Sequence, residues 1–268
     1  MSHASEAGPA GHAGSAGTAG PDAAGLSAQP DRGASWWRFP LAWPQWARRT
    51  RVLAAVAAVS GAVFLTLALL VDAGWESGFR LDARIASWAD EFVQSHERYE
   101  ELVSMVTHLG DSLSVGVFAG FATVILLGHR LWRSFWFLFV TLGVGFLGAY
   151  VMKYVVDRPR PPSEFGLEEF SPSFPSGHTT GSTLLWLALF LIIIPWEPRS
   201  RWPWIGFFSV GMLTVVAASR VLLAAHYLSD VLAGLCWGLA WVCLSLLLVQ
   251  PWKEIEGIRE RQGRGTET

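Results

Sequence analysis

Six long apolar runs constrain the fold of this chain more than any other feature of its sequence. Most of them approach the roughly 20 residues that a helix needs to cross a bilayer. The composition agrees, because 51% of the 268 residues are hydrophobic and only 16% are charged, which is too apolar for a typical soluble domain. The sequence therefore predicts an all-α fold, an integral membrane bundle of six transmembrane helices. The runs cover approximately residues 52–71, 113–128, 134–152, 179–195, 204–222 and 231–249.

The distribution of basic residues predicts the orientation of this bundle. With an even number of spans, the two terminal regions and the loops at 129–133 and 196–203 fall on one side of the membrane. That side carries thirteen of the twenty Lys and Arg residues. By the positive-inside rule both termini are expected in the cytoplasm, so the remaining loops face outward. Because nothing resembles an organelle address, we expect a multi-pass protein of the cell membrane with a periplasmic or extracellular outer face.

Composition also divides the chain into segments. Residues 1–35 are mainly Ala, Gly, Ser and Pro, which bury too little apolar surface to offset the entropy of ordering, so we expect a disordered cytoplasmic tail. Residues 36–51 combine four Trp with several Arg, a pattern typical of chain at the headgroup level. The six-helix membrane domain is then expected over 52–250, and residues 251–268 as a cytoplasmic C-terminal tail.

The connection between the first two runs, residues 72–112, is long for a hairpin. Its large apolar residues alternate with charges, which favours an amphipathic helix resting on the outer surface of the membrane. A plain solvated loop is the alternative. The apolar residues concerned are Trp75, Phe79, Leu81, Ile85, Trp88 and Phe92.

Two further features limit the possible partners. The net charge of −2 gives no excess of basic residues to neutralise a nucleic-acid backbone, so nucleic acid is not an expected partner. Cys236 and Cys243 are seven residues apart in one apolar run, about 10 Å along a helix, which is too far for a disulfide. We interpret them as small buried side chains. The sequence indicates no oligomeric state.

A first polar cluster follows the third run, at its outer end. Lys153 is followed by Arg158-Pro159 and then by Arg160-Pro161. A guanidinium offers a planar fork of donors and an ammonium offers a compact charge, so these cations form a candidate phosphate clamp. Basic residues that flank a span also extend toward the headgroups without any further role, and this cluster alone does not decide between the two.

A second cluster, Pro175-Ser176-Gly177-His178, precedes the fourth run. Ser is a good helix cap and the free N–H groups of a first helical turn bind anions, so the segment predicts a helix start that holds a phosphate. His178 could then donate a proton to a departing alkoxide. An ordinary capped helix with a surface histidine is the alternative.

The third cluster joins the fifth and sixth runs. It contains Ser219-Arg220, His226 and Asp230. If the sixth helix starts near Ala225, His226 and Asp230 lie one turn apart, and the carboxylate directs one ring nitrogen outward. A histidine held in this way is a good nucleophile toward phosphorus. A hydrogen-bonded pair without a chemical role is the alternative.

Together, these clusters resemble the three-part signature of the type 2 phosphatidic acid phosphatase superfamily, the lipid phosphate phosphatases. That signature is Lys, six residues, Arg-Pro; then Pro-Ser-Gly-His; then Ser-Arg, five residues, His, three residues, Asp. All three parts occur here in order and without substitution. The resemblance covers about residues 100–249, and it implies that the 52–250 domain is a membrane phosphatase with a catalytic site at its outer rim.

The resemblance also implies a role for each residue. His226 attacks phosphorus to give a phosphohistidine, Asp230 orients its ring, and His178 protonates the leaving oxygen. Fixed cations replace a metal, and no cofactor is expected, since Glu164, Glu168 and Glu169 lack ligand spacing. The residues expected to hold the phosphate oxygens are Lys153, Arg160, Ser176, Gly177 and Arg220.

The partner implied is a lipid phosphate embedded in the bilayer, because a site at the rim suits a headgroup whose tails remain in the membrane. Undecaprenyl diphosphate, phosphatidylglycerophosphate and phosphatidate are the leading candidates. Transfer of the phosphoryl group to another lipid is one alternative. A non-catalytic lipid-phosphate binder or transporter is another, although it would not need a histidine paired with a carboxylate. Related vanadium-dependent haloperoxidases are soluble, and the apolar runs argue against that chemistry.

Overall fold

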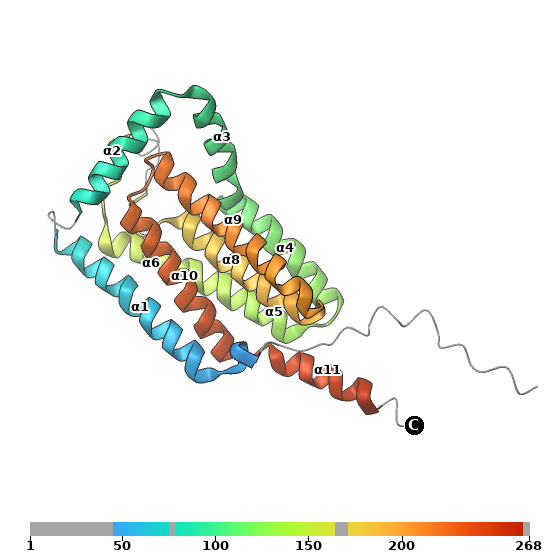
Figure 1. Ribbon diagram of the computed structural model, residues 1–268. Coiled ribbons are helices and arrows are strands. Elements are labelled where there is room, and N and C mark those ends of the chain that lie inside the picture. The colour runs from blue at the N-terminus through green and yellow to red at the C-terminus, as the bar shows by residue number, and fades with distance from the viewer. Residues whose placement is uncertain (1–44, 75–78, 164–170, 265–268) are drawn as a thin grey trace, which may run out of the picture. The chain divides into compact units, whose positions relative to one another are not determined.

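The computed structural model describes residues 45–74, 79–163 and 171–264, and within these ranges the regular structure is helical throughout. Each of the six apolar runs lies on a helix, as the sequence predicts (Figure 1). The tail expected over residues 1–35 and most of the Trp-rich segment lie outside the described residues. The helices of the apolar runs are α1 (Thr50–Asp72), α4 (Ser112–Gly128), α5 (Trp132–Phe139), α6 (Gly145–Val156), α8 (Gly177–Ile193), α9 (Trp202–Leu222) and α10 (Leu228–Val249).

Five helical stretches are long and apolar enough to cross a membrane, and a sixth is possible. Helices α5 and α6 count as one stretch, because a π-helical turn at Val140–Val144 joins them. The second run is the exception: α4 has 17 residues and reaches spanning length only with the preceding stretch Arg98–Gly110, from which it is bent by 43°. The prediction of an all-α membrane bundle is therefore confirmed, with five or six spans.

The long connection after α1 is helical. It forms α2 (Arg80–Gln94) and α3 (Glu97–Thr107), which pack against α9 beyond one end of the spanning helices (Figure 1). One face of α2 is buried and carries Asp82, Ala86, Ala89 and Val93 at helical spacing. The prediction of an amphipathic helix is thus confirmed over the solvated loop, and its contact with the membrane stays a prediction.

Helix α8 is the most buried of the spanning helices, with α9 and α10 as its main neighbours. Apart from His178, its first two turns consist of small residues, so the neighbouring backbones can approach closely. A Cβ atom on Gly234 of α10 would lie 2.9 Å from the carbonyl oxygen of Ser176. This contact needs glycine, and it places the second turn of α10 beside the start of α8.

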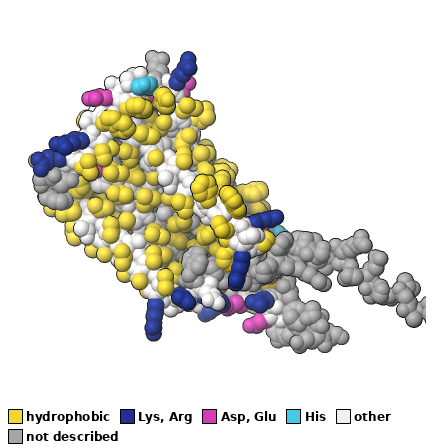
Figure 2. All heavy atoms as spheres, in the orientation of Figure 1, with side chains coloured by type: hydrophobic (Ala, Val, Ile, Leu, Met, Phe, Trp, Pro, Cys, Tyr) yellow, Lys and Arg dark blue, Asp and Glu magenta, His cyan; other side chains and the backbone are white. Residues whose placement is uncertain are grey.

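The surface of the bundle is apolar along the helices. Large exposed side chains such as Leu113, Phe121 and Val124 line α4, and Figure 2 shows hydrophobic side chains over most of the visible face, with the charged side chains mainly toward its two ends. Such an arrangement suits a protein whose middle is in contact with lipid.

Residues 252–264, expected as part of a C-terminal tail, form helix α11 (Trp252–Arg264). The side chains of Trp252 and Ile255 are buried against the end of the bundle. The Glu254 carboxylate accepts hydrogen bonds from the backbone N–H groups of Arg133 (3.0 Å) and Ser134 (3.1 Å), which begin α5. A carboxylate at a helix N-terminus is stabilising, which explains why this helix docks there.

Candidate active site

A cavity of about 240 Å³ lies where α6, α8 and the link between α9 and α10 meet. It brings together residues of all three polar clusters, namely Lys153, Arg160, Gly177, His178 and His226. The remaining lining residues are Gly110, Ser112, Phe146, Ala149, Tyr150 and Ser171. Ser176, Arg220 and Asp230 are not among the lining residues, and all three are buried in the surrounding protein.

His226 lies in the link between α9 and α10, with only 1% of its surface exposed. Its backbone N–H donates to the carbonyl oxygen of Arg220 at 3.2 Å. Its Nε2 is 3.1 Å from Nη1 of Arg160, while its Nδ1 is 3.4 Å from Oγ of Ser173. Because a guanidinium can only donate, Nε2 carries the lone pair and Nδ1 carries the proton of the neutral ring.

The expectation that the sixth helix starts near Ala225 is wrong. Helix α10 begins at Leu228, because Tyr227 adopts an extended conformation and its N–H donates to Oδ2 of Asp230 at 3.0 Å in a capping box. His226 therefore lies outside the helix. Its Nδ1 is 3.7 Å from Oδ2 of Asp230, which is an ion-pair distance rather than a hydrogen bond.

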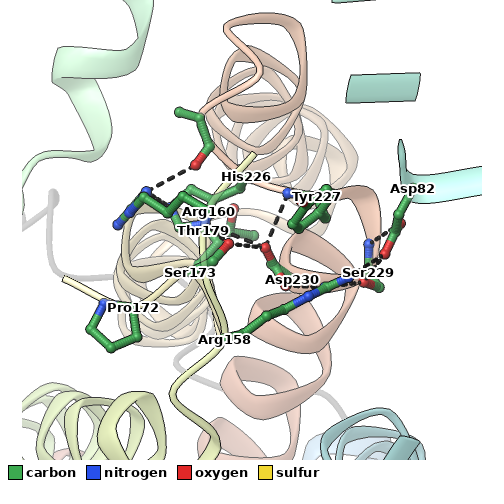
Figure 3. A network of polar contacts seen from close by, with 12 residues as sticks. Asp82, Arg158, Arg160, Pro172, Ser173, Thr179, His226, Tyr227, Ser229 and Asp230 are labelled. Atoms are coloured by element: carbon green, nitrogen blue, oxygen red, sulfur yellow. Dashed lines mark hydrogen bonds and ion pairs between the residues drawn. The ribbon is translucent and has the colours of Figure 1, made fainter. Parts of the chain in front are cut away.

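The Asp230 carboxylate is fully buried and has a partner on each oxygen (Figure 3). Oδ1 accepts from Nη1 of Arg158 at 2.5 Å, and Oδ2 accepts from the Ser173 hydroxyl as well as from the Tyr227 N–H. Ser173 thus contacts both the carboxylate and the imidazole. No sequence pattern singles it out, since a serine before Pro-Ser-Gly-His is an ordinary loop residue.

Arg158 belongs to the buried network around Asp230 rather than facing lipid headgroups. Its guanidinium bridges Asp230 and Asp82, with Nη2 3.0 Å from Oδ2 of Asp82. The rings of Phe79 and Tyr227 lie 4.7 and 4.1 Å from its central carbon. Burial raises the pKa of the Tyr227 phenol, and the positive charge of Arg158 offsets this only in part, so the phenol stays neutral at physiological pH.

Backbone carbonyls and one hydroxyl fix the two cavity cations. Arg160 donates from Nε to the carbonyl oxygen of Ser171 (2.8 Å), from Nη2 to the Ser171 hydroxyl (3.1 Å) and from Nη1 to the carbonyl oxygen of Ala225 (2.9 Å). Lys153 donates from Nζ to the carbonyl oxygen of Pro172 at 2.6 Å. The segment that precedes α8 therefore holds both cations at the cavity wall.

His178 is paired with a carboxylate that sequence reasoning missed. Its Nε2 is 2.5 Å from Oδ1 of Asp111, and the other oxygen of Asp111 is 2.7 Å from Nδ1 of His108. Gly110 permits this approach, because a Cβ atom there would lie 2.4 Å from a methyl group of Val216. An aspartate just before an apolar run predicts only a helix cap, so its partner could not be inferred.

The start of α8 differs from the expected cap. Ser176 occupies the N-cap position, but its hydroxyl makes no capping hydrogen bond and accepts instead from the Thr179 hydroxyl at 3.0 Å. Its backbone N–H donates to the carbonyl oxygen of Asp230 at 3.1 Å, which ties α8 to α10. Gly177 and His178 bring the N-terminus of α8 to the cavity.

Arg220 is buried, and its Nη1 donates to the Thr107 hydroxyl at 3.1 Å. This bond links α9 to the end of α3. Among the described residues, no group of three or more His, Cys, Asp or Glu side chains is arranged to hold a metal ion. Glu164, Glu168 and Glu169 lie outside the described residues.

Comparison with known proteins places this site in a family. A model described as the PAP2 superfamily matches residues 133–254, the stretch that contains all three clusters. Over this stretch, slightly less than half of its length, the chain is similar to the PAP2 superfamily. The resemblance seen in the sequence is therefore confirmed. The match includes Arg158 and Asp230, whereas Asp82 and Asp111 precede it.

Curated PAP2 relatives share part of the chain. Lipid A 1-phosphatases of Rhizobium johnstonii and Rhizobium etli are 33% and 32% identical over 123 residues, which are 42% of this chain and 46% and 49% of the relatives. The chain thus spans about half the length of these relatives. Phosphatidylglycerophosphatase B of Bacillus subtilis is 28% identical over 144 residues, 52% of this chain and 70% of the relative.

The PAP2 fold is also seen in a solved structure. A crystal structure of a transmembrane PAP2-type phosphatidylglycerolphosphate phosphatase from Bacillus subtilis superposes with a TM-score of 0.62 and 22% identity. It covers 75% of this chain and 96% of the other. At this identity the likeness shows the fold, and the chemistry is argued from the residues of the cavity.

Proposed function

We propose that this protein hydrolyses a membrane lipid phosphate through a phosphohistidine formed on His226. One observation carries the proposal: the Nε2 atom of His226 accepts from Arg160 in a cavity that also holds Lys153 and His178. A nucleophile, two fixed cations and a second histidine are the groups that phosphoryl transfer to an imidazole requires. The names of the relatives, which are phosphatases, support the same reaction class.

The proposed reaction has two steps. In the first, the Nε2 lone pair of His226 forms a bond to phosphorus, the bond to the lipid oxygen breaks, and the His178 imidazolium gives its proton to that oxygen. In the second, neutral His178 removes a proton from water, the hydroxide attacks phosphorus, and the bond to Nε2 breaks. Inorganic phosphate leaves, and both histidines return to their starting forms.

Fixed positive groups stabilise the phosphoryl oxygens in this proposal. Arg160 and Lys153 are held at the cavity by carbonyl oxygens, and the N-terminus of α8 adds backbone N–H groups at Gly177. Ser176 and Arg220 act from the surrounding protein, by holding α8 and α9 in place. The reaction then needs no metal, which the presence of EDTA in the assay tests.

A lipid substrate is favoured by the wall of the cavity that α6 provides. Tyr150 lines the cavity and is 59% exposed on a helix of spanning character, so the cavity reaches the lipid-facing surface. A headgroup can enter from the side while its tails stay in the bilayer. Candidates are phosphatidylglycerophosphate and a lipid A 1-phosphate, from the relatives' names, together with phosphatidate and undecaprenyl diphosphate. The positive-inside rule puts the cavity on the outer face of the cell membrane.

The test is phosphate release by the purified protein in detergent with EDTA, using these four lipids and the variant His226→Gln. We expect release from at least one lipid, and none from the variant. Release that requires an added lipid alcohol as acceptor would establish a phosphotransferase instead. Absence of release from every lipid by folded protein, with or without an acceptor, would leave a lipid-phosphate binder.

A further inference from the structure

Asp82 is a buried carboxylate on a helix outside the matched PAP2 segment. Its Oδ1 accepts from the backbone N–H of Ser229 at 3.0 Å, and its Oδ2 accepts from the Ser229 hydroxyl and from Arg158. A carboxylate is costly to bury without partners, so its position on the inner face of α2 requires this network. Asp82 thereby joins the peripheral helix to the first turn of α10 (Figure 3).

Arg158 divides its guanidinium between two carboxylates. Nη1 is 2.5 Å from Oδ1 of Asp230, and Nη2 is 3.0 Å from Oδ2 of Asp82. The rings of Phe79 and Tyr227 lie near the same guanidinium, so its direction is fixed by packing as well as by charge. As a result, Arg158 contacts one oxygen of Asp230 and leaves the other, Oδ2, toward His226.

The charges of this network do not cancel. Two carboxylates share one guanidinium, so with both carboxyl groups ionised these three side chains together carry one negative charge beside the Nδ1 edge of His226. Without Asp82, the charge of Asp230 would be balanced by Arg158 alone. A phosphorylated imidazole that keeps its Nδ1 proton is positively charged, so a negative neighbour stabilises the intermediate more than the neutral ring.

On the basis of the proposed function, we propose that Asp82 is a positioning residue: through Arg158 it keeps Oδ2 of Asp230 directed at His226 and preserves the net negative charge that stabilises the phosphohistidine. Different groups contact the two edges of the His226 imidazole, as this proposal requires. Arg160 faces Nε2, where phosphate binds, whereas Ser173 and Asp230 face Nδ1. Lys153 and His178 line the same cavity and contribute on the phosphate side.

The test compares Asp82→Asn with Asp90→Asn, a matched change on the same helix whose carboxylate bonds only to Gln94 among the described residues. Four quantities are measured: kcat and KM for phosphatidylglycerophosphate, affinity for orthovanadate as a mimic of the pentacoordinate phosphorus, and affinity for inorganic phosphate. For Asp82→Asn we expect kcat and orthovanadate affinity to fall by at least about tenfold, with KM and phosphate affinity changed by less than about threefold. Asp90→Asn should resemble the unmodified protein.

A double variant separates charge from anchoring. In Asp82→Asn/Arg158→Gln, Asp230 is again the one charge of the network, so orthovanadate affinity should recover relative to Asp82→Asn. If Asp82 has a purely structural role, the double variant should instead bind orthovanadate more weakly than Asp82→Asn does. If Asp82→Asn does not fold, the double variant is measured in its place: affinity near that of the unmodified protein supports the inference, and complete loss of affinity in the folded double variant overturns it.

The outcomes distinguish the inference from the function on which it rests. If the unmodified protein releases phosphate and Asp82→Asn matches Asp90→Asn, the inference is wrong and the function stands. If no lipid is hydrolysed but orthovanadate binding depends on Asp82, the function is wrong and the inference stands. Absence of both activities in the folded unmodified protein overturns both.

Discussion

Oδ1 of Asp111 lies 2.5 Å from Nε2 of His178. The two residues come from different elements, the turn before α4 and the first turn of α8. A carboxylate at this distance favours the imidazolium form, which is the form that a proton donor needs. The second oxygen of Asp111 bonds to His108, whose side chain is 67% exposed, so the pair is also connected to the surface.

His178→Asn should lower kcat by an amount that depends on the leaving group of the substrate. For a lipid phosphate, whose leaving alkoxide must be protonated, we expect kcat to fall by about 100-fold or more. For p-nitrophenyl phosphate, whose phenolate leaves without a proton, the fall should be much smaller. Asp111→Asn should show the same pattern in weaker form. Equal losses on both substrates would contradict a role for His178 as proton donor.

His226→Gln should prevent formation of the phosphoenzyme. Glutamine is preferred to alanine here, because His226 is almost completely buried and a cavity would lower stability. We expect no acid-labile phosphoprotein on rapid quenching and no phosphate release from either type of substrate. The control is His129→Gln, which should behave as the unmodified protein. His129 follows the C-terminus of α4, whereas Ser112 at the N-terminus of that helix lines the cavity. A phosphoenzyme that persists in His226→Gln would place the nucleophile elsewhere.

Arg160→Lys keeps the charge but loses the planar fork that Ser171 and Ala225 hold. Because an ammonium cannot reproduce these bonds and contact phosphate together, KM should rise and kcat should fall, each by about tenfold. Arg201→Lys makes the same change at the opposite end of the bundle, where Arg201 pairs with Glu197. Similar losses in the two variants would argue against the proposed phosphate site.

Gly234→Ala should disturb the site through the backbone. The added methyl group would lie 2.9 Å from the Ser176 carbonyl oxygen and 3.0 Å from the Thr180 hydroxyl, so α8 and α10 must separate. We expect a loss of about 1–3 kcal/mol in stability together with reduced activity. In Gly211→Ala on α9 the methyl group meets no atom within 4 Å, and stability should not fall. Thermal unfolding in detergent compares the two.

The proposed orientation can be tested by cysteine labelling of intact cells with a membrane-impermeant maleimide. In a background without Cys236 and Cys243, Ser95→Cys lies between α2 and α3 and should react from outside. Ser200→Cys lies in the link before α9 and should react only after permeabilisation. The reverse pattern would place the cavity on the cytoplasmic side.

The sequence by itself determined the helical membrane fold, because spanning helices must be long and apolar. It also indicated the resemblance to the PAP2 superfamily, because the three motifs keep fixed spacings. It placed Lys153, Arg160, Gly177, His178 and His226 together through their positions at the outer ends of the predicted spans. It did not determine where α10 begins, since the residue after His226 caps that helix with its own backbone.

Only the tertiary structure decided three further members of the polar network around the two histidines. Asp82, Asp111 and Ser173 come from a peripheral helix, a turn and a loop, and no spacing in the chain relates them to His226 or His178. Their contacts depend on how helices pack, which rests on close approaches at positions such as Gly110 and Gly234. Local sequence encodes helix formation and lipid exposure, whereas a pairing between side chains far apart in sequence exists only once packing has removed the water between them.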